Sequence, residues 1–326
     1  MQFLKFLEST RTGFGDFFFS AITNLGDEVF FLALAITFFW CVNKRQGYYI
    51  LMTGVIGAVV NQWLKIIFRI PRPWINTGLT TVGDPIADLN ATGYSFPSGH
   101  TQNIAGTLGC IGRYNRQRWV KILSAVVIAL VAFSRLYLGV HTPLDVGVSL
   151  VIAAILVFSF YFIFRTEEAC EKYLTYAITG SVIFSIGFIL YVFLIPESGF
   201  NAEEIENLMH ARENAATLIG CLLGLFVVYP LDKHYIKFET EGRWYAQLIK
   251  LGIGLSVNLA IMKLLKQPLV NLLGMYPGRI VRYFLIVMFS GVIWPMTFKY
   301  FKKLRISFME NFTEWLVSKF RKNDTV

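Results

Sequence analysis

Charged residues and cysteines are scarce in this sequence of 326 residues. Charged side chains make up 16% of it, hydrophobic residues 55%, and the mean hydropathy is +0.53. A soluble domain carries about 25% charged residues, so this scarcity excludes an ordinary soluble protein. The few cysteines are scattered in or beside apolar runs and indicate neither a disulfide framework nor a zinc site. They are Cys41, Cys110, Cys170 and Cys221.

The first 26 residues lack the pattern of a cleaved signal peptide. Glu8 and Asp16 interrupt the apolar residues, and no small-residue cleavage site follows an apolar region. Phenylalanine and leucine recur among polar residues, as is typical of a segment that lies at the membrane interface. We therefore expect residues 1–27 to form an interfacial amphipathic segment.

What the sequence has in abundance is long apolar runs, many of them close to the roughly 20 residues needed to cross a bilayer. In lipid, only helices and closed barrels satisfy every backbone polar group, and we expect helices here. The predicted fold is all-α, a polytopic membrane helix bundle with about nine transmembrane helices and amphipathic terminal segments. The candidate spans are residues 29–42, 47–68, 97–112, 119–138, 143–164, 175–195, 214–231, 246–265 and 282–300.

The formal charge of +9 does not indicate a nucleic-acid partner, because the basic residues alternate between loops and form no single patch. Placing most basic loops on one side satisfies the positive-inside rule with an outer N-terminus and a cytoplasmic C-terminus. The acidic loop 196–213 then lies outside. Four basic residues contradict this scheme, because they fall on the outer side: Lys263, Lys266, Arg279 and Arg282.

A first polar cluster consists of Lys65, near the end of the second apolar run, and Arg72-Pro73 just beyond it. The residue before a proline disfavours helical backbone angles, and Ile70 precedes Pro71. The helix should therefore end near Arg69 or Ile70. An isolated lysine at a helix end is explained by snorkelling, an interpretation that we keep for Arg69. Lys65 and Arg72 instead suit a phosphate site, Lys as a point charge and Arg as a planar fork.

The second cluster, Pro97-Ser98-Gly99-His100, opens the third run. Ser98 is a good N-cap residue, and a helix start with Gly99 presents free N–H groups to an anion. A capped helix after a turn explains the first three residues but leaves His100 unexplained. His100 could protonate a leaving oxygen, which is the task of a general acid.

The third cluster is Ser134-Arg135 followed by His141 and Asp145. Thr142 to Asp145 fits a capping box, so Asp145 could be a helix cap alone. It could also accept a hydrogen bond from one nitrogen of His141 and leave the other nitrogen free as a nucleophile. Both interpretations can hold, with one carboxylate oxygen for each task.

Together the clusters suit one phosphoryl group held by Lys65, Arg72 and Arg135, with Ser98 and the Gly99 N–H completing the cradle. We expect no metal and no cofactor, because the clusters contain no group of carboxylates. The loop acids Asp84 and Asp88 lack ligands at metal spacing and are interpreted as solvated residues.

The three clusters, read as K-x6-RP, PSGH and SR-x5-H-x3-D, resemble the signature of the type 2 phosphatidic acid phosphatase superfamily at all eleven defined positions. That grouping includes lipid phosphate phosphatases, glucose-6-phosphatase and the vanadium haloperoxidases. The resemblance covers residues 65–145. It implies a metal-independent phosphatase in which His141 forms a phosphohistidine, His100 is the acid and base, and Asp145 orients His141. It also assigns the phosphate site to Lys65, Arg72, Ser98, Gly99 and Arg135.

On this basis we expect residues 28–170 to be a phosphatase core with five transmembrane helices and residues 171–300 to add four more. Residues 301–326 form a basic amphipathic cytoplasmic tail. The four added spans carry no motif that indicates their role, and a homodimer face is one possibility. A bacterial plasma membrane, with the site facing outside, is the expected location.

Three functions remain open at this stage. Membrane lipids, as amphiphilic phosphates or prenyl diphosphates, are the expected partners and substrates, because their tails can stay in the bilayer. A nine-span layout is similar to that of glucose-6-phosphatase, which favours a sugar phosphate as the alternative. A transporter would also place ionisable groups near helix ends, but it does not need two histidines and an aspartate in this arrangement.

Overall fold

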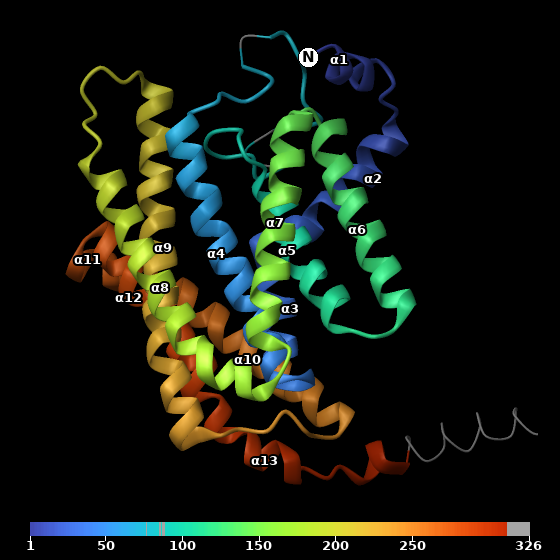
Figure 1. Ribbon diagram of the computed structural model, residues 1–326, viewed down its shortest axis with the longest axis vertical. Helices are drawn as coiled ribbons and strands as arrows, with labels where there is room; N and C mark the ends of the chain where they lie inside the picture. The colour runs from blue at the N-terminus through green and yellow to red at the C-terminus, as the bar shows by residue number, and fades with distance from the viewer. Residues whose placement is uncertain (76, 85, 87–88, 312–326) are drawn as a thin grey trace, which may run out of the picture.

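The structure is a computed structural model that describes residues 1–75, 77–84, 86 and 89–311, and these residues form helices and loops without any β-strand (Figure 1). The elements are α1 (Gln2–Ser9), α2 (Gly13–Thr23), η1 (Asn24–Gly26), α3 (Glu28–Thr37), η2 (Phe38–Val42), α4 (Lys44–Phe68), α5 (Gly99–Tyr114), α6 (Arg118–Tyr137), α7 (Pro143–Phe164), α8 (Glu167–Leu194), α9 (Ala202–Leu231), η3 (Asp232–Ile236), α10 (Trp244–Leu264), α11 (Lys266–Leu273), α12 (Met275–Met288), η4 (Phe289–Ile293), η5 (Pro295–Thr297) and α13 (Phe298–Lys303).

Seven of the described helices are long and apolar enough to cross a membrane. On α7, apolar side chains at helical spacing face outward with 57–61% of their surface exposed, namely Val151, Ile155, Phe158 and Phe162. Such a stripe is unfavourable in water and suits contact with lipid tails. The chain is therefore a polytopic helical bundle of an integral membrane protein. The seven segments are Lys44–Phe68, Arg118–Tyr137, Pro143–Phe164, Glu167–Leu194, Ala202–Ile236, Trp244–Leu273 and Met275–Lys303.

The predicted count of nine spans is not confirmed. The run at 97–112 forms α5, a helix of only 16 residues. The run at 29–42 belongs to a bent pair in which Gly13–Gly26 and Glu28–Val42 meet at 52°, and counting that pair as one span gives eight. An apolar run of 14 residues is too short to cross the roughly 30 Å hydrocarbon core by itself. It reaches a membrane-spanning length only together with the preceding segment, Gly13–Gly26.

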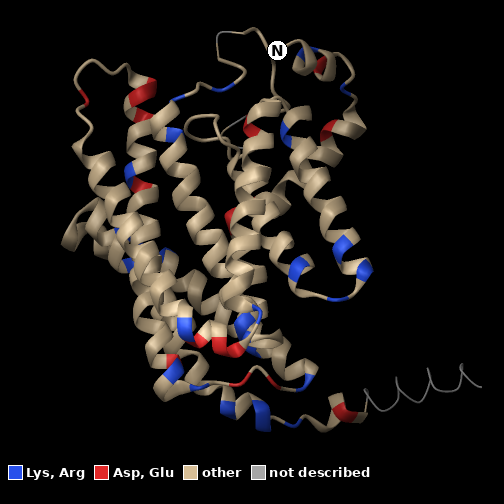
Figure 2. Ribbon diagram, viewed as in Figure 1, with Lys and Arg blue, Asp and Glu red and all other residues tan. Residues whose placement is uncertain are grey.

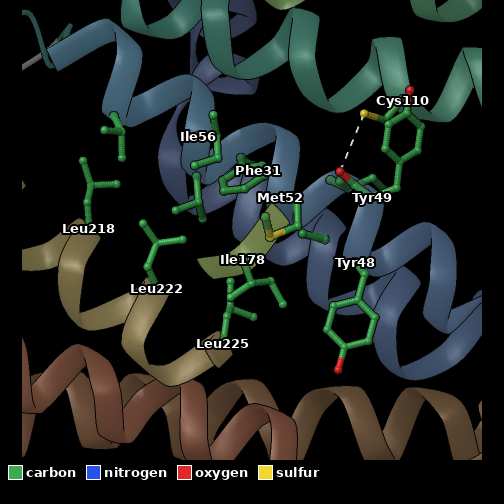
Figure 3. Packing of buried hydrophobic residues seen from close by; sticks show 14 of the residues in the cluster. Phe31, Tyr48, Tyr49, Met52, Ile56, Cys110, Ile178, Leu218, Leu222 and Leu225 are labelled. Atoms are coloured by element: carbon green, nitrogen blue, oxygen red, sulfur yellow. Dashed lines mark hydrogen bonds between the residues drawn. The ribbon is translucent and has the colours of Figure 1, made fainter. Parts of the chain in front are cut away.

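Helix α4 lies at the centre of the bundle. Of its most apolar stretch 61% is buried, against 22% for α7. Figure 3 shows Met52 and Ile56 of α4 facing Leu218 and Leu222 of α9, and all four belong to one buried cluster. The added helices and the predicted core therefore share a single packed interior.

Two glycines let α9 pack closely against α12. A Cβ added at Gly220 would lie 2.5 Å from the carbonyl oxygen of Ile280, and one at Gly224 would lie 2.6 Å from Cβ of Val287. Small residues four apart are a common means of close helix packing in lipid, where van der Waals contact replaces the hydrophobic effect. Larger residues at these two positions would separate α9 from α12.

Charge is unevenly distributed along the bundle (Figure 2). Lys and Arg are numerous at the end that carries α13, where acidic residues also lie, and acidic residues mark the start of α9 at the opposite end. The predicted sidedness stays a prediction. Of the four basic residues that contradicted it, Arg279 pairs with Glu213 inside the bundle and Arg282 is buried.

The terminal segments behave in two ways. In α1, Leu4 and Leu7 are buried whereas Phe3 and Phe6 are exposed, as expected of an amphipathic helix. Beyond α13, the predicted amphipathic tail is described only to residue 311. Of the apolar residues on which that prediction rests, Phe308 is described and exposed. The others lie outside the described residues: Phe312, Trp315, Leu316 and Phe320.

Candidate active site

The three clusters lie at helix ends that backbone contacts hold together. At the start of α5, the backbone N–H of Ser98 donates to the carbonyl of Asp145 at 3.2 Å, and the Ser149 hydroxyl donates to the carbonyl of Ser98 at 2.9 Å. The Ser95 N–H donates to the carbonyl of Ile70 at 2.8 Å, just beyond α4. Residues up to eighty positions apart in the sequence therefore meet at one place.

Local sequence signals set these helix ends as predicted. Ser98 is the N-cap of α5, and its hydroxyl accepts from the Thr101 N–H. Thr142 and Asp145 form a capping box at the start of α7, with Pro143 at the first position. The caps fix where the cluster residues leave their helices.

Helix α4 ends at Phe68, next to the predicted boundary. Arg69 follows in the left-handed conformation, with φ at 48°. Its guanidinium stacks on the ring of Phe200, 4.8 Å away, in the loop between α8 and α9. Arg69 therefore contacts that loop, which agrees with its exclusion from the signature.

His141 and Asp145 are joined through Ser95. Nδ1 of His141 lies 3.5 Å from Oδ2 of Asp145, and the Ser95 hydroxyl lies 2.6 Å from the same oxygen and 3.4 Å from Nδ1. The Thr142 N–H also donates to Oδ2, at 2.7 Å. The expected division of tasks between the two carboxylate oxygens is thus wrong, because one oxygen serves both the cap and the histidine. Ser95 was missed from the sequence, although it stands two residues before Pro97.

The other nitrogen of His141 faces Arg72. Nη1 of Arg72 lies 2.9 Å from Nε2, while the guanidinium also donates to the carbonyls of Val140, Gly93 and Thr92. A guanidinium can only donate, so Nε2 must accept and the ring proton must be on Nδ1. This is the tautomer that leaves the Nε2 lone pair available for attack.

Electrostatics favour the neutral form of His141. Burial holds the pKa of His141 well below 6.5, and repulsion from Arg72, Arg135 and Lys65 lowers it further. Burial also lowers the pKa of Arg72 to about 10, against the opposing attraction of Asp145. At neutral pH a charged guanidinium therefore stands beside a neutral imidazole.

The remaining two cations are buried and form no salt bridge within the described residues, although the charge of Asp27 acts on Arg135. Nζ of Lys65 donates to the carbonyl of Tyr94, and Nη1 of Arg135 donates to the hydroxyl of Thr23 at 2.7 Å and to the carbonyl of Leu89. Nε of Arg135 is buried and has no hydrogen-bond partner among the described residues. Buried cations that lack a counter-charge are costly and favour the binding of an anion.

His100 has a partner that the sequence analysis did not find. Its Nε2 lies 2.7 Å from Oδ1 of Asp27, a residue of the predicted interfacial segment. The sequence signal was weak, because Asp27 stands before an apolar run where an acid is also explained as a helix cap.

A polar recess adjoins Lys65 between α4, the 92–94 segment and α9. The start of α9 supplies two asparagines and a histidine to its wall, so the added helices contribute to the surroundings of the clusters. It is lined by Gln62, Lys65, Ile66, Thr92, Gly93, Tyr94, Asn207, His210, Ala211 and Asn214.

The described part of the chain contains no group of three or more histidine, cysteine or acidic residues placed to hold a metal ion. Asp84 is exposed, and its carboxylate accepts from the N–H of Ile86. Asp88 lies outside the described residues.

The helical membrane bundle, with two histidines among buried cations, is typical of membrane proteins that bind an anionic group. Two family models match the chain, "PAP2 superfamily" over residues 45–169 and "PAP2 superfamily phosphatase, transmembrane extension" over residues 216–305. The chain belongs to the PAP2 superfamily, and the added helices, which carried no recognisable motif, match its transmembrane extension.

Individual relatives cover parts of the chain. It is 32% identical over 166 residues to a probable sphingosine-1-phosphate phosphatase of Dictyostelium discoideum, covering 45% of this chain and 38% of that protein. It is 32% identical over 120 residues to undecaprenyl-diphosphatase BcrC of Bacillus subtilis, covering 36% and 58%. The chain thus spans about half the length of the curated relatives that it matches. Aquifex aeolicus LpxE is similar in structure with a TM-score of 0.40 and 23% identity, over 48% of this chain and 92% of that one.

Proposed function

We propose that this protein is an integral-membrane phosphatase that releases phosphate from lipid phosphates or prenyl diphosphates. The observation that carries the proposal is the grouping of Lys65, Arg72 and Arg135, all at most 7% exposed, around a neutral His141. No salt bridge within the described residues compensates these three cations. A phosphoryl group would supply the missing negative charge and would meet the nucleophile in the same place.

The proposed reaction has two displacements. Nε2 of His141 attacks phosphorus, the bond to the leaving oxygen breaks, and His100 gives that oxygen a proton. Water then attacks the phosphohistidine while His100 takes a proton from it, and phosphate leaves with His141 restored. Asp145 and Ser95 hold the Nδ1 proton of His141, so that Nε2 stays directed at phosphorus.

The cations stabilise charge during both steps. Arg72 exchanges its contact with Nε2 for the equatorial oxygens of the phosphoryl group, which Lys65 and Arg135 share. Ser98 and the Gly99 N–H complete the cradle at the start of α5. This arrangement needs no metal, because the three side chains already supply the positive charge that a metal would bring.

An amphiphilic substrate is favoured over a sugar phosphate by two observations. The protein is embedded in the bilayer, so a head group can reach the site while its tail stays in lipid. Two of the relatives are named for sphingosine 1-phosphate and undecaprenyl diphosphate, which are both phosphates of long-chain molecules. The likeness to glucose-6-phosphatase rested on nine spans, a count that is not confirmed.

Phosphate release by the purified full-length protein in detergent tests the proposal. Phosphatidic acid and alkyl phosphates of increasing chain length are compared with glucose 6-phosphate at equal concentration. Each buried methylene contributes about 0.8 kcal/mol, so kcat/KM should rise by orders of magnitude with chain length. Equal cleavage of glucose 6-phosphate and a long-chain phosphatidic acid would favour the sugar-phosphate alternative, and release from none of them would reject the phosphatase.

We also propose that the site faces outward, because the basic residues gather at the opposite end of the bundle. The bacterial plasma membrane and a homodimer formed through the added helices stay predictions from the sequence.

A further inference from the structure

The N-terminal segment, residues 1–27, lies outside both family models yet contacts the candidate active site. Its residue Thr23 accepts a hydrogen bond from Arg135, and its residue Asp27 meets His100. On the basis of the proposed phosphatase function, we propose that Asp27 is a positioning residue that sets the ring orientation and proton affinity of His100. The acid and base of the reaction would then depend on a residue outside the shared family domain.

The geometry at Asp27 is that of a carboxylate holding an imidazole. Oδ1 lies 2.7 Å from Nε2 of His100 and accepts from Nδ2 of Asn90 at 3.2 Å. A carboxylate accepts, so Nε2 of His100 carries a proton. Among the described residues no other hydrogen bond reaches the ring, and Nδ1 is therefore the nitrogen that can serve the leaving oxygen. The carboxylate also stabilises the protonated imidazole, the form that donates.

The backbone around Asp27 is clamped to α5. Gly26 lies directly on His100: a Cβ added there would be 2.8 Å from Cβ of His100 and 2.9 Å from its carbonyl oxygen. The side chain of Asn103 donates to the carbonyl of Gly26 at 3.3 Å. Asp27 is also the N-cap position of α3, at the bend of 52°. The carboxylate is thus held by its own backbone at a short, defined distance from the histidine.

The charge of Asp27 matters because His100 both gives and takes a proton in the proposed reaction. His100 enters the first step as the imidazolium, which the Asp27 carboxylate stabilises against the effect of burial. It gives its Nδ1 proton to the leaving oxygen and takes one from water in the second step, while the Nε2 proton stays on the ring, bonded to Asp27. Without the carboxylate charge, the imidazolium is less stable, and a leaving group that needs a proton departs slowly. A leaving group that departs as an anion does not need that proton. Its rate of departure should therefore change little when the charge of Asp27 is removed.

The test uses leaving groups of different basicity. Asp27→Asn, which keeps the shape but removes the charge, is compared with the unaltered protein on a long-chain alkyl phosphate and on p-nitrophenyl phosphate. The expected result is a loss in kcat of about 100-fold on the alkyl phosphate, the lower range for general acid catalysis. The p-nitrophenolate burst, which reports phosphorylation of His141, should fall less than about fivefold. KM should stay within about threefold, because Asp27 forms no hydrogen bond or salt bridge with Lys65, Arg72 or Arg135 among the described residues.

Asp16→Asn is the matched control. Asp16 is another carboxylate of the same segment, and it accepts from the Tyr137 hydroxyl at 3.1 Å without touching either histidine. Loss of the Asp16 charge should lower kcat only slightly, and by the same factor on both substrates. Equal losses on both substrates with Asp27→Asn, or no loss on either, would overturn the positioning role. An inactive parent protein would instead reject the proposed function, so the two failures are distinguishable.

Discussion

Nη1 of Arg72 lies 2.9 Å from Nε2 of His141, so a phosphate-binding cation covers the proposed nucleophilic nitrogen. The contact identifies Nε2 as the acceptor, keeps the imidazole neutral and holds the guanidinium where a phosphoryl oxygen is needed. A substrate phosphate must take this cation away from the nitrogen when it binds. The same charge that lowers the proton affinity of His141 therefore becomes a ligand of the substrate.

The first prediction concerns pH. Because the pKa of His141 is lowered, its neutral form should persist below pH 6.5, and the acid limb of kcat/KM should not appear at that value. Arg72→Gln removes a neighbouring positive charge, raises the pKa of His141 and should move the limb upward by roughly 1 pH unit. Substrate titration is common to both profiles, so their difference reports the enzyme. A downward shift would contradict the assignment.

The second prediction separates the two histidines. His141→Ala should abolish turnover and phosphoenzyme formation, whereas His100→Ala should accumulate phosphoenzyme with p-nitrophenyl phosphate, since water attack then lacks its base. Rapid quench with a labelled substrate should give an acid-labile, base-stable label on His141. His234→Ala, at an exposed position outside the clusters, is the control and should remain active. Full activity in His141→Ala would refute the mechanism.

The third prediction concerns the source of positive charge. EDTA should leave phosphate release unchanged, because Lys65, Arg72 and Arg135 stabilise the transition state. Vanadate should inhibit in competition with substrate, since a trigonal-bipyramidal vanadate on His141 imitates in-line transfer. Activity lost in EDTA and restored by a divalent ion would show that a metal takes part.

The fourth prediction tests the bridge from His141 to Asp145. Ser95→Ala removes the hydroxyl that lies between Asp145 and Nδ1 of His141. Loss of about 1 kcal/mol of transition-state stabilisation should lower kcat by roughly fivefold with little change in KM. Asp145→Ala should cost at least about 1000-fold, because the Nδ1 proton loses its acceptor and α7 its cap. The control is Ser185→Ala, at a buried serine of α8 whose hydroxyl has no partner among the described residues. An unchanged kcat in Ser95→Ala would remove Ser95 from the mechanism.

The fifth prediction concerns sidedness. With the four native cysteines replaced, a cysteine at Ser198 should react with an impermeant maleimide added to intact cells, whereas one at Asn115 should react only after permeabilisation. Ser198 lies in the acidic loop before α9, and Asn115 lies in the basic turn between α5 and α6. Labelling at 115 from outside would reverse the proposed orientation.

The helix ends of the candidate site could be predicted, because its cluster residues lie beside local capping signals. Ser98 and Thr142 cap helices, and Pro71 follows the end of α4, so the spacing of the clusters already indicated which residues meet. The all-α class followed from apolar runs, because lipid leaves few alternatives for the backbone. The number of spans did not follow, since hydropathy cannot tell a short interior helix such as α5 from a full crossing.

The sequence by itself determined the helical membrane class and the residues of the three clusters, because hydropathy and capping act over a few turns of chain. Only the tertiary structure decided their partners. Asp27 meets His100 across more than seventy residues, and Ser95 reaches Asp145 across fifty. Such contacts depend on how helices pack. The sequence around Asp27, a lone aspartate before an apolar run, does not predict that the bend after Gly26 brings it to His100.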